Sequence, residues 1–226
     1  MKYRAVLFDF DGTLAPSLPL WLKAYHFALA QCGVAASDED VLRRCFFRDW
    51  ADVAADFGAF TAQEFQREVD AGLRQAFAEA ELFPLARELI EHCRAHGLQT
   101  ALVTSSPRTI VIGVIARLGL GELFDFVVCG DDVRNYKPHP EPVLTTLQAL
   151  RRLPVEAIMV GDSHVDILAG RAAGTRTALF LPQGHSPFHS VDKLHAAGPD
   201  HVFADHSELP ALLELPELFA AGPPRV

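Results

Sequence analysis

The sequence has few basic residues. Its 20 Lys and Arg stand against 29 Asp and Glu, which gives a formal net charge of −9 and a pI near 5.5. Binding to a nucleic-acid backbone or to an anionic membrane needs a basic stripe, and no such stripe occurs. We therefore expect neither nucleic acid nor membrane as a partner. Small anionic substrates remain compatible, because a few local positive charges suffice to bind them.

The sequence also has no long hydrophobic run. The longest, residues 109–116, is flanked by Arg108 and Arg117 and falls far short of the roughly 18 residues that a membrane-spanning helix needs. Residues 1–4 precede only a few apolar residues before Asp9, too few for an export signal. These observations predict a cytoplasmic protein.

Cysteine is scarce and scattered. No Cys-x-x-Cys pair occurs, and the sequence around the cysteines is mostly apolar. The thiols are therefore expected to be reduced and buried in the hydrophobic core, in agreement with a cytoplasmic location. The four residues are Cys32, Cys45, Cys93 and Cys129.

Hydrophobic residues, by contrast, are abundant. They make up 50% of the 226 residues, enough for one large core and a second small one. Every pattern between residues 16 and 82 is helical, whereas helices and strands alternate from Phe83 onward, as in a parallel sheet covered on both faces. We predict an α/β fold. Residues 1–15 and 83–226 form a Rossmann-like, doubly wound parallel-sheet core, and residues 16–82 form a small all-helical domain inserted after the first strand.

Periodicity and capping signals predict the individual elements. Strands are expected at residues 5–8, 100–104, 124–129, 157–160 and 177–181, with a short edge strand at 202–203. Helices are expected at residues 20–31, 41–47, 85–96, 109–118, 142–153, 165–173 and 209–215. A further helix is expected to begin at the capping box Thr61–Glu64 and to continue along an apolar stripe that ends at Phe77. Residues 15–19 are expected to be a linker, and residues 222–226 to be frayed.

The first strand ends in two carboxylates. Ala5–Phe8 is an unbroken apolar stretch, typical of a strand buried on both faces, and Asp9 and Asp11 follow it. Uncompensated buried carboxylates are costly, so this pair calls for a cation, a proton or strong hydrogen-bond donors. Gly12 lets the backbone turn sharply and approach a ligand. Taken alone, the segment is equally compatible with a solvated acidic turn.

A second strand is followed by hydroxyl groups. Thr104, Ser105 and Ser106 come after the strand at 100–104, and Pro107 suits the first turn of the next helix. Ser106 is a candidate N-cap. Free backbone N–H groups at such a helix start can bind a phosphate, although a plain capped helix would show the same sequence.

A third strand end is acidic again. Asp162 and Asp166 follow Gly161 at the start of a helix. With Asp9 they form a cluster of hard oxygen ligands suited to Mg²⁺, which prefers a few carboxylates, retained waters and substrate phosphate. Lys137, held in a stiff proline-rich loop, can supply the positive charge that such a cluster needs to bind an anion.

These four segments resemble the four motifs of the haloacid dehalogenase superfamily in order and spacing. They are Phe8–Leu14, Val103–Ser105, Lys137–Pro138 and the pair Asp162 and Asp166 after Gly161. The resemblance covers essentially the whole chain. The helical insertion looks like that family's mobile cap, and its place resembles that of phosphoglycolate phosphatase-like members.

The resemblance implies a Mg²⁺-dependent phosphatase that acts on a small phosphorylated metabolite, phosphoglycolate-like or a sugar phosphate, as a monomer or homodimer. Asp9 would be the nucleophile that forms an aspartyl-phosphate, and Asp11 the acid and base toward the leaving alcohol and the water. The substrate-binding residues would be Gly12, Thr104, Ser105, Ser106 and Lys137, with Thr104 and Lys137 on the transferring phosphoryl. The metal would be held by Asp9, Asp162 and the backbone carbonyl of Asp11, with Asp166 completing or orienting that shell.

Asp11 also separates branches of the resembling family. Members that split carbon–halogen bonds typically carry an aromatic residue at this place, and phosphonate-cleaving members a small one. An aspartate therefore favours phosphoryl transfer from oxygen. Phosphomutases of the β-phosphoglucomutase type share the aspartate and remain an alternative, but they carry a histidine about ten residues further on, where this chain has Trp21; His26 lies on another face of the same helix.

Two readings from other classes also compete. A signalling receiver uses similar residues, but it is about half this length and lacks a helical insertion. A non-catalytic phospho-ligand-binding protein on the same fold would have no need to keep all four motifs intact. Residues 15–17 and 105–107 depart from the family's common sequences, and because both segments lie near the cap hinge or the substrate, the substrate is left open.

The helical insertion is rich in aromatic and basic residues. The aromatic residues, expected to form its own small core, are Phe46, Phe47, Trp50, Phe57 and Phe60. Its basic residues, a solvated helix face or else an anion-recognising patch, are Arg43, Arg44 and Arg48. Several histidines outside the insertion are expected at the surface or in supporting positions rather than as metal ligands, since we expect no pair to have zinc spacing. They are His139, His164, His185, His189 and His206.

Overall fold

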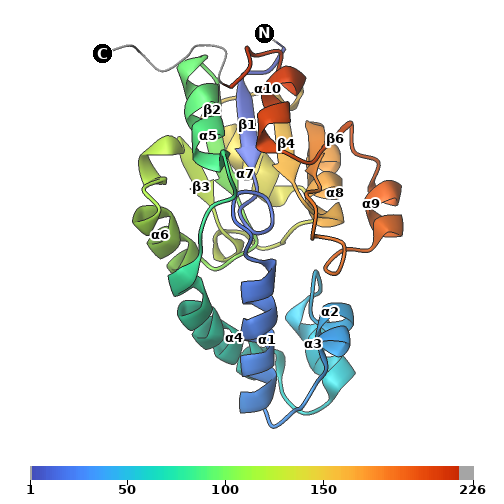
Figure 1. Ribbon diagram of the computed structural model, residues 1–226. Helices are drawn as coiled ribbons and strands as arrows, with labels where there is room; N and C mark the ends of the chain where they lie inside the picture. Colours follow the sequence, from blue (N-terminus) through green and yellow to red (C-terminus); the bar gives the residue numbers. More distant parts are fainter. Residues whose placement is uncertain (1, 219–226) are drawn as a thin grey trace. The chain divides into compact units, whose positions relative to one another are not determined.

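The computed structural model describes residues 2–218 and contains two compact units (Figure 1). The helical unit comprises Pro16–Glu81, and the sheet unit comprises Met1–Ala15 and Leu82–Val226. The boundary after the helical unit thus lies one residue before the position expected from the sequence. The segment 222–226, expected to be frayed, lies outside the described residues. No helix in the described part of the chain is long and apolar enough to cross a membrane.

The sheet unit is built on six parallel strands in the order β3-β2-β1-β4-β5-β6. Their bounds are β1 Ala5–Phe8, β2 Gln99–Val103, β3 Phe126–Val128, β4 Ala157–Gly161, β5 Arg176–Phe180 and β6 His201–Phe203. All four residues of β1 are fully buried, as an unbroken apolar stretch predicts. The predicted α/β fold with a doubly wound parallel sheet is confirmed.

The register of β1 aligns the ends of three strands. Phe8 pairs with Leu102 of β2 and with Val160 of β4. The winding reverses between β1 and β4, because β2 and β3 extend to one side of β1 and β4, β5 and β6 to the other. In open α/β sheets, ligands bind beyond the carboxyl ends of the strands at such a switch point. The residues that follow β1, β2 and β4 are therefore brought to that place.

Helices and short 3₁₀ turns connect the strands (Figure 1). The helices of this unit are α5 Ala86–Ala95, α6 Arg108–Arg117, α7 Glu141–Leu150, α8 His164–Ala173, α9 Val191–Ala197 and α10 Leu209–Leu212. Residues of α7 and α8 pack against Leu7 and Met159 in one hydrophobic cluster. Helix α7 ends three residues earlier than predicted, where Arg151 adopts a left-handed conformation. Helix α9, of seven residues, was not predicted from the sequence.

The helical unit consists of α1 Leu18–Gln31, α2 Asp38–Arg44, α3 Trp50–Phe57 and α4 Ala62–Ala76. The predicted capping box opens α4: the Glu64 N–H donates to Thr61 Oγ1 over 3.2 Å, and the Thr61 N–H donates to the Glu64 carboxylate over 2.8 Å. Gly72 of α4 lies so close to α1 that an added Cβ would be 3.0 Å from Ala24 Cα. The predicted linker at residues 15–19 is too long, because Pro19 already lies in the first turn of α1.

Aromatic residues of this unit pack against one another. Of the five expected to form its core, Phe46 is buried, whereas Phe47, Trp50, Phe57 and Phe60 are only partly buried. Tyr25 contacts Phe46, Trp50 and Phe65, and Phe60 stacks on Phe65 with ring centroids 4.8 Å apart.

The three arginines Arg43, Arg44 and Arg48 have partners inside the helical unit. Arg43 pairs with Asp40, and Arg48 pairs with Asp56. Arg44 lies 3.6 Å from the centre of the Phe57 ring. These contacts favour a structural role for the three side chains over an anion-recognising patch.

Candidate active site

Asp9 follows the last residue of β1 and is almost completely buried. Its backbone N–H donates to the Val160 carbonyl over 2.8 Å, which extends the pairing of β1 with β4 by one residue. Its Oδ1 accepts a hydrogen bond from Lys137 Nζ over 2.6 Å. The structure thus fixes the Asp9 carboxylate at the switch point of the sheet.

The turn after β1 requires a glycine. Gly12 has a φ of +77°, and a Cβ at this position would lie 1.9 Å from Asp162 Oδ2. The turn is closed by the Gly12 N–H, which donates to the Ala15 carbonyl over 2.8 Å. Any larger residue would collide with the carboxylate and adopt a backbone conformation that L residues disfavour. The missing side chain therefore makes room for Asp162.

Asp11 is linked to the segment after β2. The Ser106 hydroxyl donates to Asp11 Oδ2, and the Ser106 N–H donates to Thr104 Oγ1 over 3.0 Å. Ser106 is therefore not the predicted N-cap of α6; Pro107 occupies that position. Ser105, also a predicted substrate-binding residue, is exposed between its two buried neighbours.

Lys137 places its ammonium group among three acceptors. Nζ donates to Asp9 Oδ1 over 2.6 Å, to Asp166 Oδ1 over 2.5 Å and to the Val103 carbonyl over 2.9 Å. Burial alone would lower the pKa of Lys137, but the adjacent Asp166 and Asp9 carboxylates outweigh it and hold that pKa above its usual value. Lys137 is therefore charged and fully hydrogen-bonded, as a buried ammonium needs to be.

Asp166 holds Lys137 and the start of α8 at once. Its Oδ2 accepts from the Ser163 hydroxyl and, over 3.1 Å, from the Ser163 N–H, which completes a capping box with Ser163 as N-cap. Its Oδ1 accepts from Lys137. Asp162 is thus not needed as the cap of α8, and its carboxylate is left for another role.

Three carboxylates of this site are suited to a hard cation. One oxygen each from Asp9, Asp162 and Asp166 lie within 4.8 Å of one another, and all three side chains are buried. Burial is the main reason why the pKa values of Asp9 and Asp162 are raised well above the usual value; neighbouring carboxylates add to the rise, and Lys137 opposes it. One ammonium group does not balance three carboxylates, so the cluster fits a divalent cation such as Mg²⁺.

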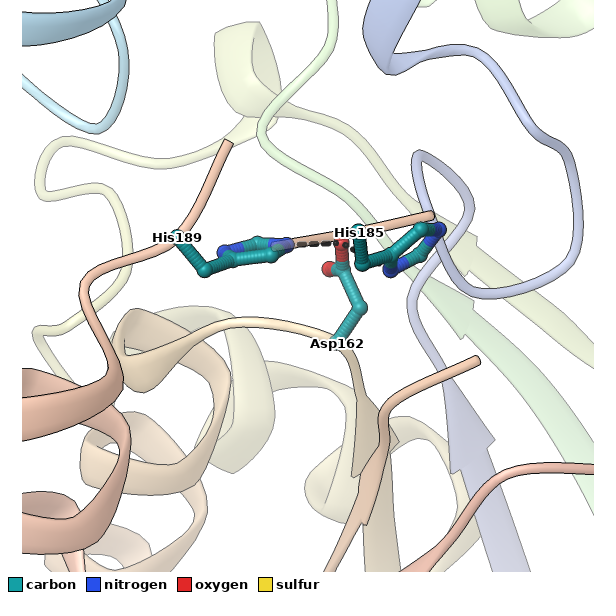
Figure 2. A group of neighbouring side chains, drawn as sticks. All are labelled: Asp162, His185 and His189. Carbon is teal, nitrogen blue, oxygen red and sulfur yellow. Dashed lines mark hydrogen bonds and ion pairs between the residues drawn. The ribbon is translucent and has the colours of Figure 1, made fainter. Parts of the chain in front are cut away.

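Two histidines that the sequence analysis excluded as metal ligands lie beside Asp162 (Figure 2). His189 Nε2 is 3.0 Å and His185 Nδ1 is 3.8 Å from Asp162 Oδ2. Both are buried, and burial lowers the pKa of each to about 4. Neither residue is at the surface, and both occupy the supporting position that was the other expectation for them. Contrary to the sequence analysis, their spacing, His-x-x-x-His, does fall within the range for zinc ligands.

The remaining histidines of that group lie elsewhere. His206 is also buried, and its two ring nitrogens lie 3.1 Å from the Pro84 carbonyl and 3.0 Å from the Thr13 carbonyl. His139 is exposed, as expected, and His164 is partly buried.

The residues relevant to a mutase are found in the helical unit. Trp21 packs against Tyr25 and Phe77 with ring centroids 5.5 and 6.2 Å apart. His26 Nε2 lies 2.7 Å from Asp38 Oδ1, at a mostly exposed site. Trp21 therefore belongs to the aromatic core of that unit.

The comparisons with known proteins identify the family of the chain. Residues 6–180 match the haloacid dehalogenase-like hydrolase family. The chain belongs to this family. It is 32% identical over 225 residues, 95% of both chains, to a phosphoglycolate phosphatase of Yersinia pseudotuberculosis serotype I. It is also 32% identical over 219 residues, 91% of this chain and 93% of the other, to an N-acetylmuramic acid 6-phosphate phosphatase of Pseudomonas putida.

Solved structures of the family share the fold. The crystal structure of a predicted phosphoglycolate phosphatase from Haemophilus somnus 129pt superimposes with a TM-score of 0.80 at 24% identity, covering 94% of this chain and 99% of that one. The chain is thus a hydrolase of this family that resembles phosphoric monoester hydrolases over nearly its whole length.

Proposed function

We propose that the protein is a Mg²⁺-dependent phosphatase that hydrolyses a small phosphorylated metabolite through an aspartyl-phosphate on Asp9. The observation that carries this proposal is the buried arrangement of Asp9, Lys137, Asp162 and Asp166 at the switch point of the sheet. A solvated acidic turn would need neither the buried lysine nor the shared carboxylate contacts. The similarity to two named phosphatases supports the same reaction.

In the first step, an Asp9 carboxylate oxygen attacks the phosphorus atom, and the bond from phosphorus to the substrate oxygen breaks. The hydrogen bond from Lys137 favours the ionised, nucleophilic form of Asp9 against the effect of its burial. Asp11, in its acid form, donates a proton to the departing alkoxide. The Ser106 hydroxyl, bound to Asp11 Oδ2, orients this carboxyl group.

In the second step, water attacks the acyl phosphate on Asp9, and Asp11 accepts the proton from that water. Inorganic phosphate leaves, and the Asp9 carboxylate is restored. Lys137 contacts Asp9, and Thr104 accepts a hydrogen bond from Ser106; both would bind the phosphoryl oxygens. Since both are buried, their hydrogen bonds would act in a region of low polarity, where such bonds are strong.

Mg²⁺ would be held by Asp9, Asp162 and the backbone carbonyl of Asp11, and when bound it would offset the negative charge of phosphate. Both oxygens of Asp166 accept hydrogen bonds, from Lys137 and from Ser163. This favours the second of the two predicted roles of Asp166, in which it orients the shell instead of completing it. The raised pKa values of Asp9 and Asp162 agree with a site that needs a cation to ionise fully.

The substrate class is a phosphate monoester of a small acid or sugar, since the two similar phosphatases are named for such substrates. Phosphate release should be measured with phosphoglycolate and a panel of sugar phosphates, with and without Mg²⁺, against Asp9→Asn as the blank. Release that equals the blank for every compound, including an aryl phosphate, would favour a non-catalytic binding protein. Conversion of a sugar phosphate into its isomer would favour a mutase. A mutase is not the favoured function, because the resembling mutases carry a histidine at the position of Trp21. The cytoplasmic location of the protein and its oligomeric state, monomer or homodimer, remain predictions.

The helical unit is proposed to be a cap that sets specificity. It has its own core and is inserted directly after the turn that follows β1. Replacing residues 16–81 by a short linker should abolish selectivity among metabolites and leave some turnover of an aryl phosphate. Unchanged selectivity in a folded deletion variant would contradict this role.

A further inference from the structure

We infer that His185, His189 and Asp162 form a second cation site, for a nitrogen-preferring divalent metal of the Zn²⁺ class. The site adjoins the carboxylate cluster and shares Asp162 with it. The inference does not rest on the proposed phosphatase activity, because its test measures metal binding and not turnover. None of the roles proposed above uses either histidine.

The distances from the two imidazoles to Asp162 are close to those that a metal imposes, and the three ligand atoms all lie within 4.8 Å of one another. His185 Nδ1 and His189 Nε2 lie 3.8 and 3.0 Å from Asp162 Oδ2. Two ligand atoms at about 2.1 Å from a tetrahedral metal are about 3.4 Å apart, a separation that these two distances bracket. Figure 2 shows the Asp162 carboxylate between the two imidazole rings, whose centroids are 5.6 Å apart.

The second observation is an unsatisfied polar atom. His185 Nδ1 is buried and has no hydrogen-bond partner among the described residues. Leaving a buried polar nitrogen unpaired is costly, and burying one beside a carboxylate that is too distant to bond to it has no structural benefit. A cation between His185, His189 and Asp162 would satisfy this nitrogen.

The loop around the site is folded so that both rings face Asp162. The Phe188 N–H donates to the His185 carbonyl over 3.0 Å, which forms a turn between the two histidines. The His185 ring also packs against Phe83 and Phe180, at 5.7 and 6.2 Å between centroids. These contacts preorganise the His185 ligand.

The ligand set selects the metal. Two imidazoles and one carboxylate suit Zn²⁺ and neighbouring transition metals, whereas Mg²⁺ prefers oxygen ligands. Three protein ligands also leave a fourth position open to water or to a substrate oxygen. Asp162 belongs to both sites. A metal held by the histidines would therefore either compete with Mg²⁺ for this carboxylate or share it with Mg²⁺.

The test uses Co²⁺ as a spectroscopic substitute for Zn²⁺ in the full chain. Co²⁺ should give the intense visible bands of a tetrahedral site with nitrogen ligands, and Zn²⁺ should abolish them while Mg²⁺ should not. His185→Asn and His189→Asn should each weaken binding by more than about tenfold, since losing a ligand costs more than losing an outer partner. His139→Asn, which changes an exposed histidine, is the matched control. Asp9→Asn should retain the bands, because it removes only the carboxylate site.

A measurement on the wild-type chain covers the case that the variants misfold. X-ray absorption of the Zn²⁺-loaded protein should show two imidazole ligands. An oxygen-only shell would overturn the inference, and so would Co²⁺ affinity unchanged in folded His185→Asn and His189→Asn. Loss of the bands in Asp9→Asn alone would place the metal in the carboxylate cluster and would equally overturn it.

Discussion

The Ser106 hydroxyl donates a hydrogen bond to Asp11 Oδ2, which joins the segment after β2 to the segment after β1. A hydrogen bond to a charged group is worth about 1.5 to 3 kcal/mol. If it holds Asp11 in place for proton transfer, Ser106→Ala should lower kcat by about tenfold or more and change KM less. Ser105→Ala, at the exposed neighbouring position, is the control. Steady-state kinetics in which both variants behave alike would contradict this role of Ser106.

Exchanging the two aspartates for asparagine separates their roles. Asp9→Asn removes the nucleophile, so no phosphoenzyme should form and turnover should fall to background. Asp11→Asn keeps the nucleophile but lacks the acid and base, and should slow turnover of an alkyl phosphate by about 10² to 10⁴. With an aryl phosphate, whose leaving group needs less protonation, phosphorylated Asp9 should accumulate. Rapid-quench mass spectrometry of the Asp9 peptide would show it; a label on Asp11 instead would mean that the roles are reversed.

Asp162→Ala tests the Mg²⁺ site. Activity of the wild-type enzyme should be lost in EDTA, because the carboxylates around Asp9 repel substrate phosphate without a cation. The variant should need more Mg²⁺ for half-maximal activity and should recover partly when Mg²⁺ is raised. The measurement is a Mg²⁺ titration of initial rates. Full wild-type activity in EDTA, or an unchanged titration in the variant, would exclude the assigned metal site.

Acid should destabilise the metal-free protein through its buried histidines. The pKa of His185 falls from an ordinary 6.5 to about 4 because of its burial. The folded state therefore binds fewer protons than the unfolded state between these values, so this stabilisation is present above pH 6.5 and is lost as the pH falls toward 4. The free energy of unfolding, measured by urea titration, should decrease less on acidification in His185→Asn than in wild type. Equal decreases would show that His185 titrates normally.

Short-range sequence signals were enough to predict the sheet and to place several residues of the candidate site at the ends of its strands. The apolar stretch Ala5–Phe8 is fully buried in β1, and Asp9 and Lys137, far apart in sequence, do meet. Such predictions succeed because buried parallel strands have unbroken apolar sequences and share one carboxyl edge.

What escaped prediction depends on contacts between distant segments. Ser106 has the sequence context of a helix cap, and only the register of β1 with β2 brings it to Asp11. The environment of His185 and His189 is set by a loop that folds back over the end of β4. Their spacing was a usable signal, but nothing local to them indicates that Asp162 lies between the rings.

The hydrogen bond between Asp9 and Lys137 joins residues 128 positions apart. Asp166, the second carboxylate that binds Lys137, and Asp162, a candidate metal ligand, lie still further along the sequence. A ribosome-bound chain has therefore made β1, the helical unit and half of the sheet before Asp9 can find its ammonium partner. Until residue 166 has emerged from the exit tunnel, Asp9 lacks the surroundings that are proposed to activate it as the nucleophile. Phosphatase activity of stalled nascent chains should thus appear only after α8 has emerged from the exit tunnel, which makes catalysis a reporter of the pairing of β1 with β4.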